Sequence, residues 1–269
     1  MRACINGATT MPYTFEEDMK AAAAAGFQAV EVWYPKLVTY LKTHKLSEAQ
    51  ALLARHKLAV ASLCPVTFTF FAPTEEIHQK LKETAQVAQA LSCNTLLVCP
   101  DVPPSDMSHQ EAVRRAADEA SRCCDIAAPY GVRLTLEPLG RHPFMPGPEV
   151  AMEIIALADR PDLMLMMDTF HYYKSGVSLE AIRAIPRGVM NLVHVNSCED
   201  LPREKLTDKH RLWPTLGVIP TAEMIRAVRA NGYDGDLSVE VFRDEYWAQS
   251  IAAIAAQAKR HLDLLMAQI

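Results

Sequence analysis

Leu163-Met164-Leu165-Met166-Met167-Asp168 is a run of five apolar residues that stops on a carboxylate. The same pattern occurs three more times, in short apolar runs that end on Glu137, His194 and Glu240. Burying an ionisable group without a partner is costly, so a buried strand that ends on one needs an explanation. Four such strand ends in succession indicate a shared partner, and a divalent cation is the simplest one.

Strands and helices are predicted to alternate along the whole chain. The expected strands cover residues 2–6, 28–33, 58–63, 95–99, 132–137, 163–168, 191–196 and 237–242. The expected helices cover residues 15–25, 47–56, 75–91, 108–130, 148–158, 179–185, 221–230 and a last stretch ending near 267, with Ser47, Thr74, Ser108 and Thr221 as caps. Strand–helix alternation implies a parallel sheet, and this number of units predicts a (β/α)8 TIM barrel. No GxGxxG motif follows the first strand, which disfavours the alternative, an open doubly wound sheet.

Composition limits the class of protein. The chain has 269 residues, of which 50% are hydrophobic and 22% charged, and no linker or low-complexity tract divides it, so we expect one domain over residues 1–269. A net charge of -5 argues against a nucleic-acid-binding surface. No apolar run approaches the ~20 residues of a membrane span, and the N-terminus lacks an apolar segment of signal-peptide length. Seven cysteines without a CxxC pair predict a reducing, cytoplasmic setting and argue against a thiolate zinc site.

The predicted strands place the four ionisable residues around one point. Side chains alternate along a strand, so one parity turns Glu137, Asp168, His194 and Glu240 all toward the barrel interior. In such barrels the active site lies at the carboxyl ends of the strands, where all four residues fall. Taken singly, each has a plainer explanation as a cap, a salt-bridge partner or a hydrogen-bonded interior histidine. Together they favour a metal centre.

The ligand set indicates which ion and which chemistry fit. Carboxylates favour Mg or Mn, and an imidazole brings Zn or Co into range, so one divalent ion of this kind is the expected cofactor. A metal on a sugar carbonyl stabilises an enediolate while the adjacent proton is removed. A carboxylate on each face of the substrate can act as base and then as acid. These are the parts that isomerisation or epimerisation of a sugar or polyol requires.

Five sequence pieces resemble the xylose isomerase-like barrel superfamily, which includes inosose isomerases and dehydratases, ketose 3-epimerases and dehydroshikimate dehydratases, and is related to endonuclease IV. The pieces span nearly the whole chain and are Leu136-Glu137-Pro138, Met167-Asp168-Thr169-Phe170-His171, Val193-His194-Val195-Asn196, Asp208-Lys209-His210-Arg211-Leu212-Trp213-Pro214 with Gly217-Val218-Ile219-Pro220, and Val239-Glu240-Val241. Each piece alone is weakly specific, whereas their order and spacing together are fairly specific.

The resemblance implies a role for each matching residue. Glu137, Asp168, His194 and Glu240 would bind one divalent metal, with Glu137 and Glu240 as the acid–base pair. His171 and Arg211 would contact substrate oxygens, and Glu31 matches a glutamate of the second strand that we count with them as a candidate substrate-binding residue. The residues alone leave alternatives open. His171 could cap the loop predicted after the sixth strand, Arg211 could be exposed on a long loop, and Glu31 could be structural.

One piece departs from the family pattern. The group usually has Pro-Gly-Glu-Gly or Pro-Gly-Asp-Gly after the arginine, and this chain has Pro214-Thr215-Leu216-Gly217, which puts the substrate and even the activity in question. A dehydratase acting on inosose or dehydroshikimate is the main alternative, because it also begins by removing a proton next to a carbonyl. A binding barrel without activity, which only this departure supports, is a more remote one. An abasic-site endonuclease has support from Asp208-Lys209-His210, but Cys64 and Cys99 stand where that enzyme has histidines.

The expected partner is a small sugar, cyclitol or keto acid, without nucleic acid or membrane, and a homo-oligomer is compatible with the sequence. Phe68, Phe70 and Phe71 follow the third predicted strand as an aromatic cluster. They could form a lid over the substrate, a dimer contact, or ordinary packing against the next helix.

Overall fold

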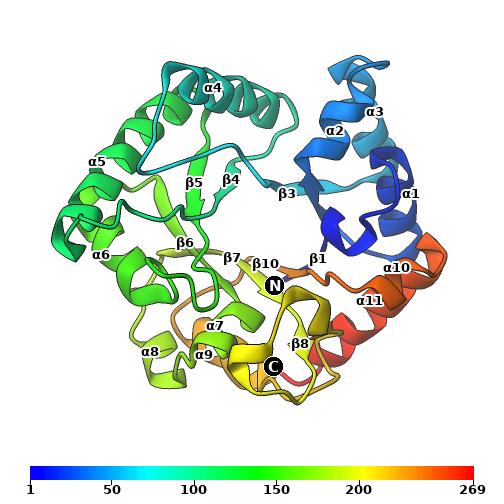
Figure 1. Ribbon diagram of the computed structural model, residues 1–269. Coiled ribbons are helices and arrows are strands. Elements are labelled where there is room, and N and C mark those ends of the chain that lie inside the picture. Colours follow the sequence, from blue (N-terminus) through cyan, green and yellow to red (C-terminus); the bar gives the residue numbers. More distant parts are fainter.

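The computed structural model describes residues 1–269 and shows a closed barrel of eight parallel strands, as the sequence predicts. The strand order around the barrel is β1-β10-β7-β6-β5-β4-β3-β2. The strands are β1 (Arg2–Asn6), β2 (Ala29–Trp33), β3 (Ala59–Cys64), β4 (Thr95–Val98), β5 (Arg133–Leu136), β6 (Leu163–Asp168), β7 (Met190–Val195) and β10 (Asp236–Val239). Figure 1 looks along this barrel and shows the helices as a ring around it.

Helices follow the strands on the outside of the barrel. They are α1 (Phe15–Ala25), α2 (Tyr34–Tyr40), α3 (Leu46–His56), α4 (Glu75–Ala90), α5 (His109–Ala127), α6 (Pro148–Ala158), α7 (Thr169–Ser175), α8 (Leu179–Arg183), α9 (Thr221–Ala230), α10 (Asp244–Trp247) and α11 (Ile251–Met266). Ser108 caps α5 as predicted, because its hydroxyl accepts from the backbone N–H of Glu111 while the Glu111 carboxylate accepts from that of Ser108.

Two predicted caps are wrong. Helix α3 begins one residue before Ser47, because the Glu48 carboxylate reaches back to the backbone N–H of Lys45 at 2.7 Å and fixes Lys45 as the N-cap. Thr221 is the first residue of α9 rather than its cap. Pro220 is the N-cap, and the Thr221 hydroxyl donates backward to the carbonyl of Asn196 at 3.1 Å.

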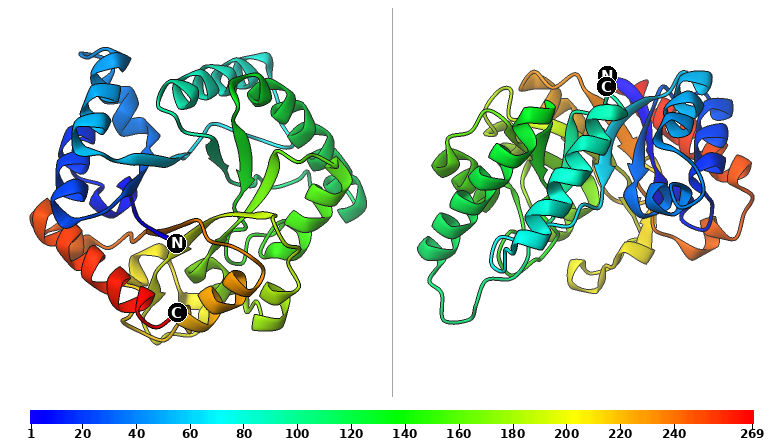
Figure 2. Two further views of the ribbon diagram at one scale, coloured as in Figure 1. Left: turned by 180° about the vertical axis from the view of Figure 1, so that it is seen from behind. Right: turned by 90° about the horizontal axis from the view of Figure 1, so that it is seen from above.

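The strand register fixes which side chains share the barrel interior. Asp168 on β6 pairs with His194 on β7, and His194 pairs with Ser238 on β10, two residues before Glu240. Both chain termini lie at one end of the barrel, and the yellow loop around residue 200 extends from the opposite end (Figure 2). That opposite end is where the parallel strands finish, so the four predicted metal ligands gather there.

Several short elements have no counterpart in the sequence prediction. The long loop from Ser197 to Pro220 contains a two-stranded antiparallel ribbon, in which β8 (Ser197–Cys198) pairs with β9 (Arg211–Leu212). Helix α7 begins immediately at the end of β6, where a loop was expected. Elements of two to seven residues are too short to establish a hydrophobic period, so a pattern cannot reveal them.

The core lies between the strands and the surrounding helices, where 67 buried apolar residues form one cluster. A second cluster of Cys64, Leu97, Met166 and Leu192 fills part of the barrel interior. The loop after β3 packs against this body, since Phe70 and Phe71 are buried and both rings contact Phe144 edge to face. Ordinary packing therefore explains these two phenylalanines. No helix has the length and apolar content needed to cross a membrane.

Candidate metal centre

Four buried side chains converge at the carboxyl end of the barrel, as the sequence parity predicts. Glu137 follows β5, Asp168 ends β6, His194 lies on β7 and Glu240 follows β10. One potential ligand atom from each lies within 4.8 Å of all the others. The Nδ1 atom of His194 is 3.1 Å from Glu240 Oε2, 3.5 Å from Asp168 Oδ2 and 3.8 Å from Glu137 Oε1. The four predicted ligands are thus brought together.

The two carboxylate oxygens of Asp168 have different roles, one as a helix cap and one at the centre. Its Oδ1 caps α7 by accepting from the backbone N–H groups of Phe170 and His171 at 2.7 and 3.2 Å. Its Oδ2 faces the centre and accepts from Arg211 Nη1 at 2.6 Å. The capping bonds hold the carboxylate in one orientation, so the oxygen left over is directed at the other three ligands.

Arg211 reaches the centre from the β8–β9 ribbon and is only 1% exposed, which excludes the solvent-exposed alternative. Its Nη1 lies 3.1 Å from Glu240 Oε2 as well as against Asp168. Its Nε donates to Asp208 at 3.0 Å, and its guanidinium carbon lies 4.6 Å from the centroid of the Phe170 ring. Pairing on one side and an aromatic face on the other fix the guanidinium within the barrel mouth.

His171 lies on α7 rather than on the predicted loop, and it is buried beside Arg211. Its Nε2 is 3.1 Å from Arg211 Nη2, and because a guanidinium can only donate, this ring nitrogen accepts. Burial lowers the pKa of His171 to about 4, so the ring is neutral and Nδ1 carries its proton. That buried Nδ1 has no hydrogen-bond partner in the protein, which leaves a donor free for a ligand.

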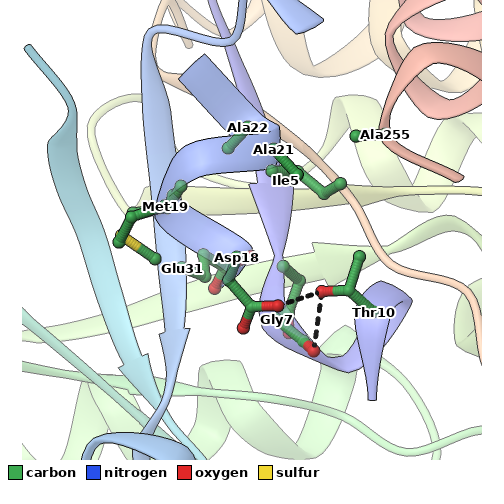
Figure 3. Close-up of a pocket in the computed structure, with 11 residues that line it drawn as sticks. Ile5, Gly7, Thr10, Asp18, Met19, Ala21, Ala22, Glu31 and Ala255 are labelled. Carbon is green, nitrogen blue, oxygen red and sulfur yellow. Dashed lines mark hydrogen bonds between the residues drawn. The ribbon is translucent and has the colours of Figure 1, made fainter. Parts of the chain in front are cut away.

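Glu31 lies behind His194. Its Oε1 is 2.8 Å from His194 Nε2, the ring nitrogen opposite the one that faces the carboxylates, and its Oε2 accepts from Ser62 at 2.5 Å. Glu31 is 1% exposed, and it also lines a cavity of about 10 Å³ between β1, β2 and α1, which has room for no more than one water (Figure 3). Glu31 thus contacts the His194 ring in the structure, and its contact with substrate stays a prediction.

The charges of the centre fit a divalent cation. Burial, together with the nearby Glu240 and Asp168, raises the pKa of Glu137 to about 8, although His194 opposes the shift. Burial also raises the pKa of Glu240. For Asp168 burial acts in the same direction, but Arg211, His171 and His194 outweigh it and hold its pKa well below the usual range. The carboxylates thus exceed the positive charge available to them, and His194 Nδ1 has no hydrogen-bond partner. A bound cation would balance the excess negative charge and would give His194 Nδ1 a partner.

Two contributors were not among the predicted site residues. Asn196 donates from Nδ2 to Asp168 Oδ1 at 3.2 Å and to the carbonyl of Glu240 at 3.1 Å, so it joins two of the ligand-bearing strands. Its parity with His194 predicts the inward position, but not these contacts. Cys99 donates to Glu137 Oε2 at 3.4 Å, and a lone cysteine at a strand end gives no pattern from which to infer this contact.

The Asp208–His210 turn, which resembles a piece of endonuclease IV, does not extend the centre. Asp208 accepts from Arg211, and Nδ1 of His210 accepts from the backbone N–H of Thr207 at 3.0 Å. Cys64 and Cys99 occupy the ends of β3 and the β4 loop, and Asn6 donates to the Cys64 sulfur at 3.2 Å. The residues at this end of the barrel form one group of potential ligands, and a multi-metal cluster has no further ones.

Fold and site together define a (β/α)8 barrel with a candidate divalent-metal centre at the carboxyl ends of its strands. Residues 19–265 match the xylose isomerase-like TIM barrel family, and the chain belongs to that family.

Relatives resemble this chain over its whole length. It is 29% identical to an inosose isomerase of Halalkalibacterium halodurans, over 96% of this chain and 94% of that protein. The crystal structure of an IolI protein with a bound zinc atom superposes with a TM-score of 0.90 at 26% identity, covering 99% of this chain and 98% of that one. A 3-dehydroshikimate dehydratase of Pseudomonas putida is 26% identical over 93% of this chain but only 39% of its own length.

Proposed function

We propose that this protein is a divalent-metal-dependent isomerase of an inosose or a related sugar or keto acid. The observation that carries the proposal is the convergence of Glu137, Asp168, His194 and Glu240, with ligand atoms within 4.8 Å of one another in a buried site. The full-length similarity to inosose isomerases supports the substrate class. Zn, Mn, Mg and Co all suit three carboxylates and one imidazole, and the zinc in the similar IolI structure favours zinc among them.

The four converging residues are the ones that would hold the ion. When bound, a divalent ion acts as a Lewis acid that polarises a carbonyl and so acidifies the neighbouring C–H bond. The protein itself must move the proton. Glu137 and Glu240 lie on either side of the Asp168–His194 pair in the strand order, so one carboxylate can take the proton from one carbon and the other can return it at the next.

Substrate orientation is assigned to the two residues at the mouth. His171 offers the unpaired Nδ1–H as a donor to a substrate oxygen, and Arg211 holds its fixed charge beside it. The aromatic face of Phe170 and the bond to Asp208 keep the guanidinium in place during turnover. We assign Glu31 to a positioning role, because it contacts the nitrogen of His194 that faces away from the ligands.

The test is exchange of the substrate α-hydrogen with solvent. The zinc- or manganese-loaded protein is incubated with a panel of inososes in D2O, and deuterium incorporation and product identity are followed by NMR. We expect exchange and isomer formation with at least one inosose, and a loss of at least about 100-fold in Glu240→Gln, the lower range for a general acid or base. The exposed Glu223→Gln is the matched control and should retain wild-type rates. Full activity in Glu240→Gln would refute the mechanism.

A dehydratase is the second candidate, supported by the similarity to 3-dehydroshikimate dehydratases. Both reactions begin by removing a proton next to a carbonyl, and they differ in whether a β-hydroxyl then leaves. Formation of a conjugated enone, seen by its ultraviolet absorbance, would identify the dehydratase. We further propose a reducing compartment such as the cytoplasm, supported by seven free cysteines, six of them buried.

A further inference from the structure

A second group of potential metal ligands lies outside the barrel, between two neighbouring helices. His78 is in the first turn of α4, and Glu119 and Cys123 are one turn apart on α5. All three are buried, and one ligand atom from each lies within 4.8 Å of the others. The His78 Nε2 to Glu119 Oε1 distance is 2.6 Å, and Cys123 Sγ donates to the same oxygen at 3.4 Å. None of these residues contributes to the centre in the barrel mouth.

Packing alone does not account for this choice of side chains. The buried face of α5 around the group is built of small apolar residues, among them Ala116, Ala117 and Ala120. An imidazole and a carboxylate in such a layer lose hydration, and a buried ion pair is often no more stable than apolar residues of similar size. A ligand that binds all three side chains gives them a function that alanine or leucine could not supply.

We propose that His78, Glu119 and Cys123 form a zinc site that links α4 to α5. One imidazole, one carboxylate and one thiolate are the ligand types that zinc takes, and zinc accepts them in a tetrahedron. With bond lengths of about 2.0–2.3 Å, neighbouring ligand atoms in a tetrahedral zinc site are about 3.4–3.6 Å apart. The sulfur-to-oxygen distance of 3.4 Å already meets this geometry, and the 2.6 Å between His78 Nε2 and Glu119 Oε1 must open by less than about 1 Å.

The three side chains lie just below the surface, since those of His78 and Glu119 are 10% and 8% exposed. A water would complete the tetrahedron as the fourth ligand. On binding, the Cys123 thiol releases its proton to solvent, and the proton that His78 Nε2 donates to Glu119 moves to Nδ1 of the same ring by a change of tautomer. Glu119 exchanges its two hydrogen bonds for a bond to the ion. The link would brace the segment before α4, which Arg115 of α5 also holds through the carbonyl of Phe71 at 2.8 Å.

Cobalt(II) absorption tests the site, because only a thiolate ligand gives a near-ultraviolet sulfur-to-cobalt charge-transfer band. We expect the wild-type protein, stripped of metal and titrated with Co²⁺, to bind about two ions per chain and to show the band. Cys123→Ser should lose the band and one ion. Cys124→Ser, a change at the neighbouring buried cysteine of the same helix, is the matched control and should retain both. Cys99→Ser should also keep the band, which excludes the sulfur in the barrel mouth.

Two more variants make the test independent of folding and of the barrel centre. His78→Gln retains the thiol and should weaken the thiolate-linked ion by at least about tenfold, the lower range for loss of even an indirect metal contact. Asp168→Asn should keep the band while losing ligation in the barrel mouth, so failure of the proposed isomerase would not affect this result. Absence of the band at saturating Co²⁺ in the wild type, or its persistence in Cys123→Ser, would overturn the proposal.

Discussion

Glu31 and His194 illustrate how one buried contact selects the nitrogen that is offered to a metal. Both ring nitrogens of His194 face carboxylates, but only Nδ1 faces the other three potential ligands, and a ring that donates from Nε2 to Glu31 offers Nδ1 to a metal. Glu31 faces Nε2, so Nδ1 is the nitrogen left for the metal. The pKa of Glu31 is lowered despite its burial, because His194 outweighs the loss of hydration.

Glu31→Gln should therefore weaken metal binding without removing a ligand. We expect metal affinity to fall about 10- to 100-fold, the range for loss of a partner behind a ligating histidine. Isothermal titration with Zn²⁺ or Mn²⁺ measures this directly, and excess metal should restore activity, which a lost substrate contact would not allow. The exposed Glu76→Gln serves as the control. Unchanged affinity with a raised KM would instead support the substrate-binding role that the sequence suggested.

A second buried charge, Asp18, gives a prediction about pH. Asp18 accepts from Thr10 at 2.7 Å and pairs with Lys36 at 2.8 Å, and Figure 3 shows it beside the turn at Gly7 and Thr10. Burial raises the pKa of Asp18 to about 7, which outweighs the effect of Lys36. The folded protein thus keeps this proton over a range in which the unfolded chain, with an ordinary aspartate pKa near 3.8, has lost it.

Stability should fall as the pH rises from about 4 to 7, because the folded state binds more protons than the unfolded state in that range. The free energy of unfolding of the wild type, measured by urea titration relative to Asp18→Asn, should drop by at most about 4 kcal/mol across this window and then level off. Exposed Asp263→Asn is the control and should parallel the wild type. A wild type that gains stability over Asp18→Asn between pH 4 and 7 would contradict the prediction.

Among the helices and strands, the sequence predicted those that a hydrophobic period marks, and it missed those that depend on tertiary contacts. The strands that end on Glu137, Asp168, His194 and Glu240 follow from apolar runs, and their common parity correctly placed all four at one end of the barrel. The β8–β9 ribbon has only two residues per strand, so no period marks it. The ribbon buries Arg211 against Asp168, and this depends on the pairing of Arg211 with Cys198, thirteen residues earlier, which only the folded chain reveals.

Gly217 makes a close backbone approach within the loop that carries the departure Pro214-Thr215-Leu216-Gly217. Its φ is +89°, and a Cβ there would collide with the backbone carbonyl of Cys198 on β8. Only glycine fits that approach, so the last glycine of the family pattern retains a structural role in this chain. Leu216 stands where the family pattern has the acidic residue, and it is 41% exposed, so this replacement does not alter the contact of Gly217.

Gly217→Ala should disturb the ribbon that carries Arg211. We expect a loss of about 1–3 kcal/mol or more in the free energy of unfolding, from backbone strain plus the clash, and a clear fall in kcat/KM. Gly188→Ala is the matched control, because its φ is +85° while no atom lies within 4 Å of the added Cβ. It should show strain alone and near-normal activity. Equal effects of the two changes would mean that the close approach at Gly217 is unimportant.

In the whole molecule, closure of the barrel brings potential metal ligands that are far apart in sequence to one site. Glu137 and Glu240 are far apart in sequence and lie on strands separated by β6 and β7, yet closure directs their carboxylates to one buried point. The sequence could predict that the four potential ligands gather at one end of the barrel, because the fold class fixes where the parallel strands end. It could not predict the surrounding contacts of Asn196, Cys99 and Glu31, since these depend on side-chain orientation rather than on the order of elements.

Gathering three carboxylates in a buried site costs stability unless a cation joins them, so metal removal should destabilise the whole barrel. At a free metal concentration of 100 times Kd, binding to the folded state alone adds about 2.7 kcal/mol. Thermal unfolding with and without chelator should therefore show a clear rise in Tm with metal, and elemental analysis should find less metal in His194→Ala. Because Cys123→Ser removes the site between the helices, the comparison is made in that variant, so that the shift reports the barrel mouth. Two results together would contradict this prediction: a Tm of Cys123→Ser that chelator does not change, and equal metal content in Cys123→Ser and Cys123→Ser/His194→Ala. They would mean that Arg211 alone compensates the charge of the carboxylates and that the centre is structural.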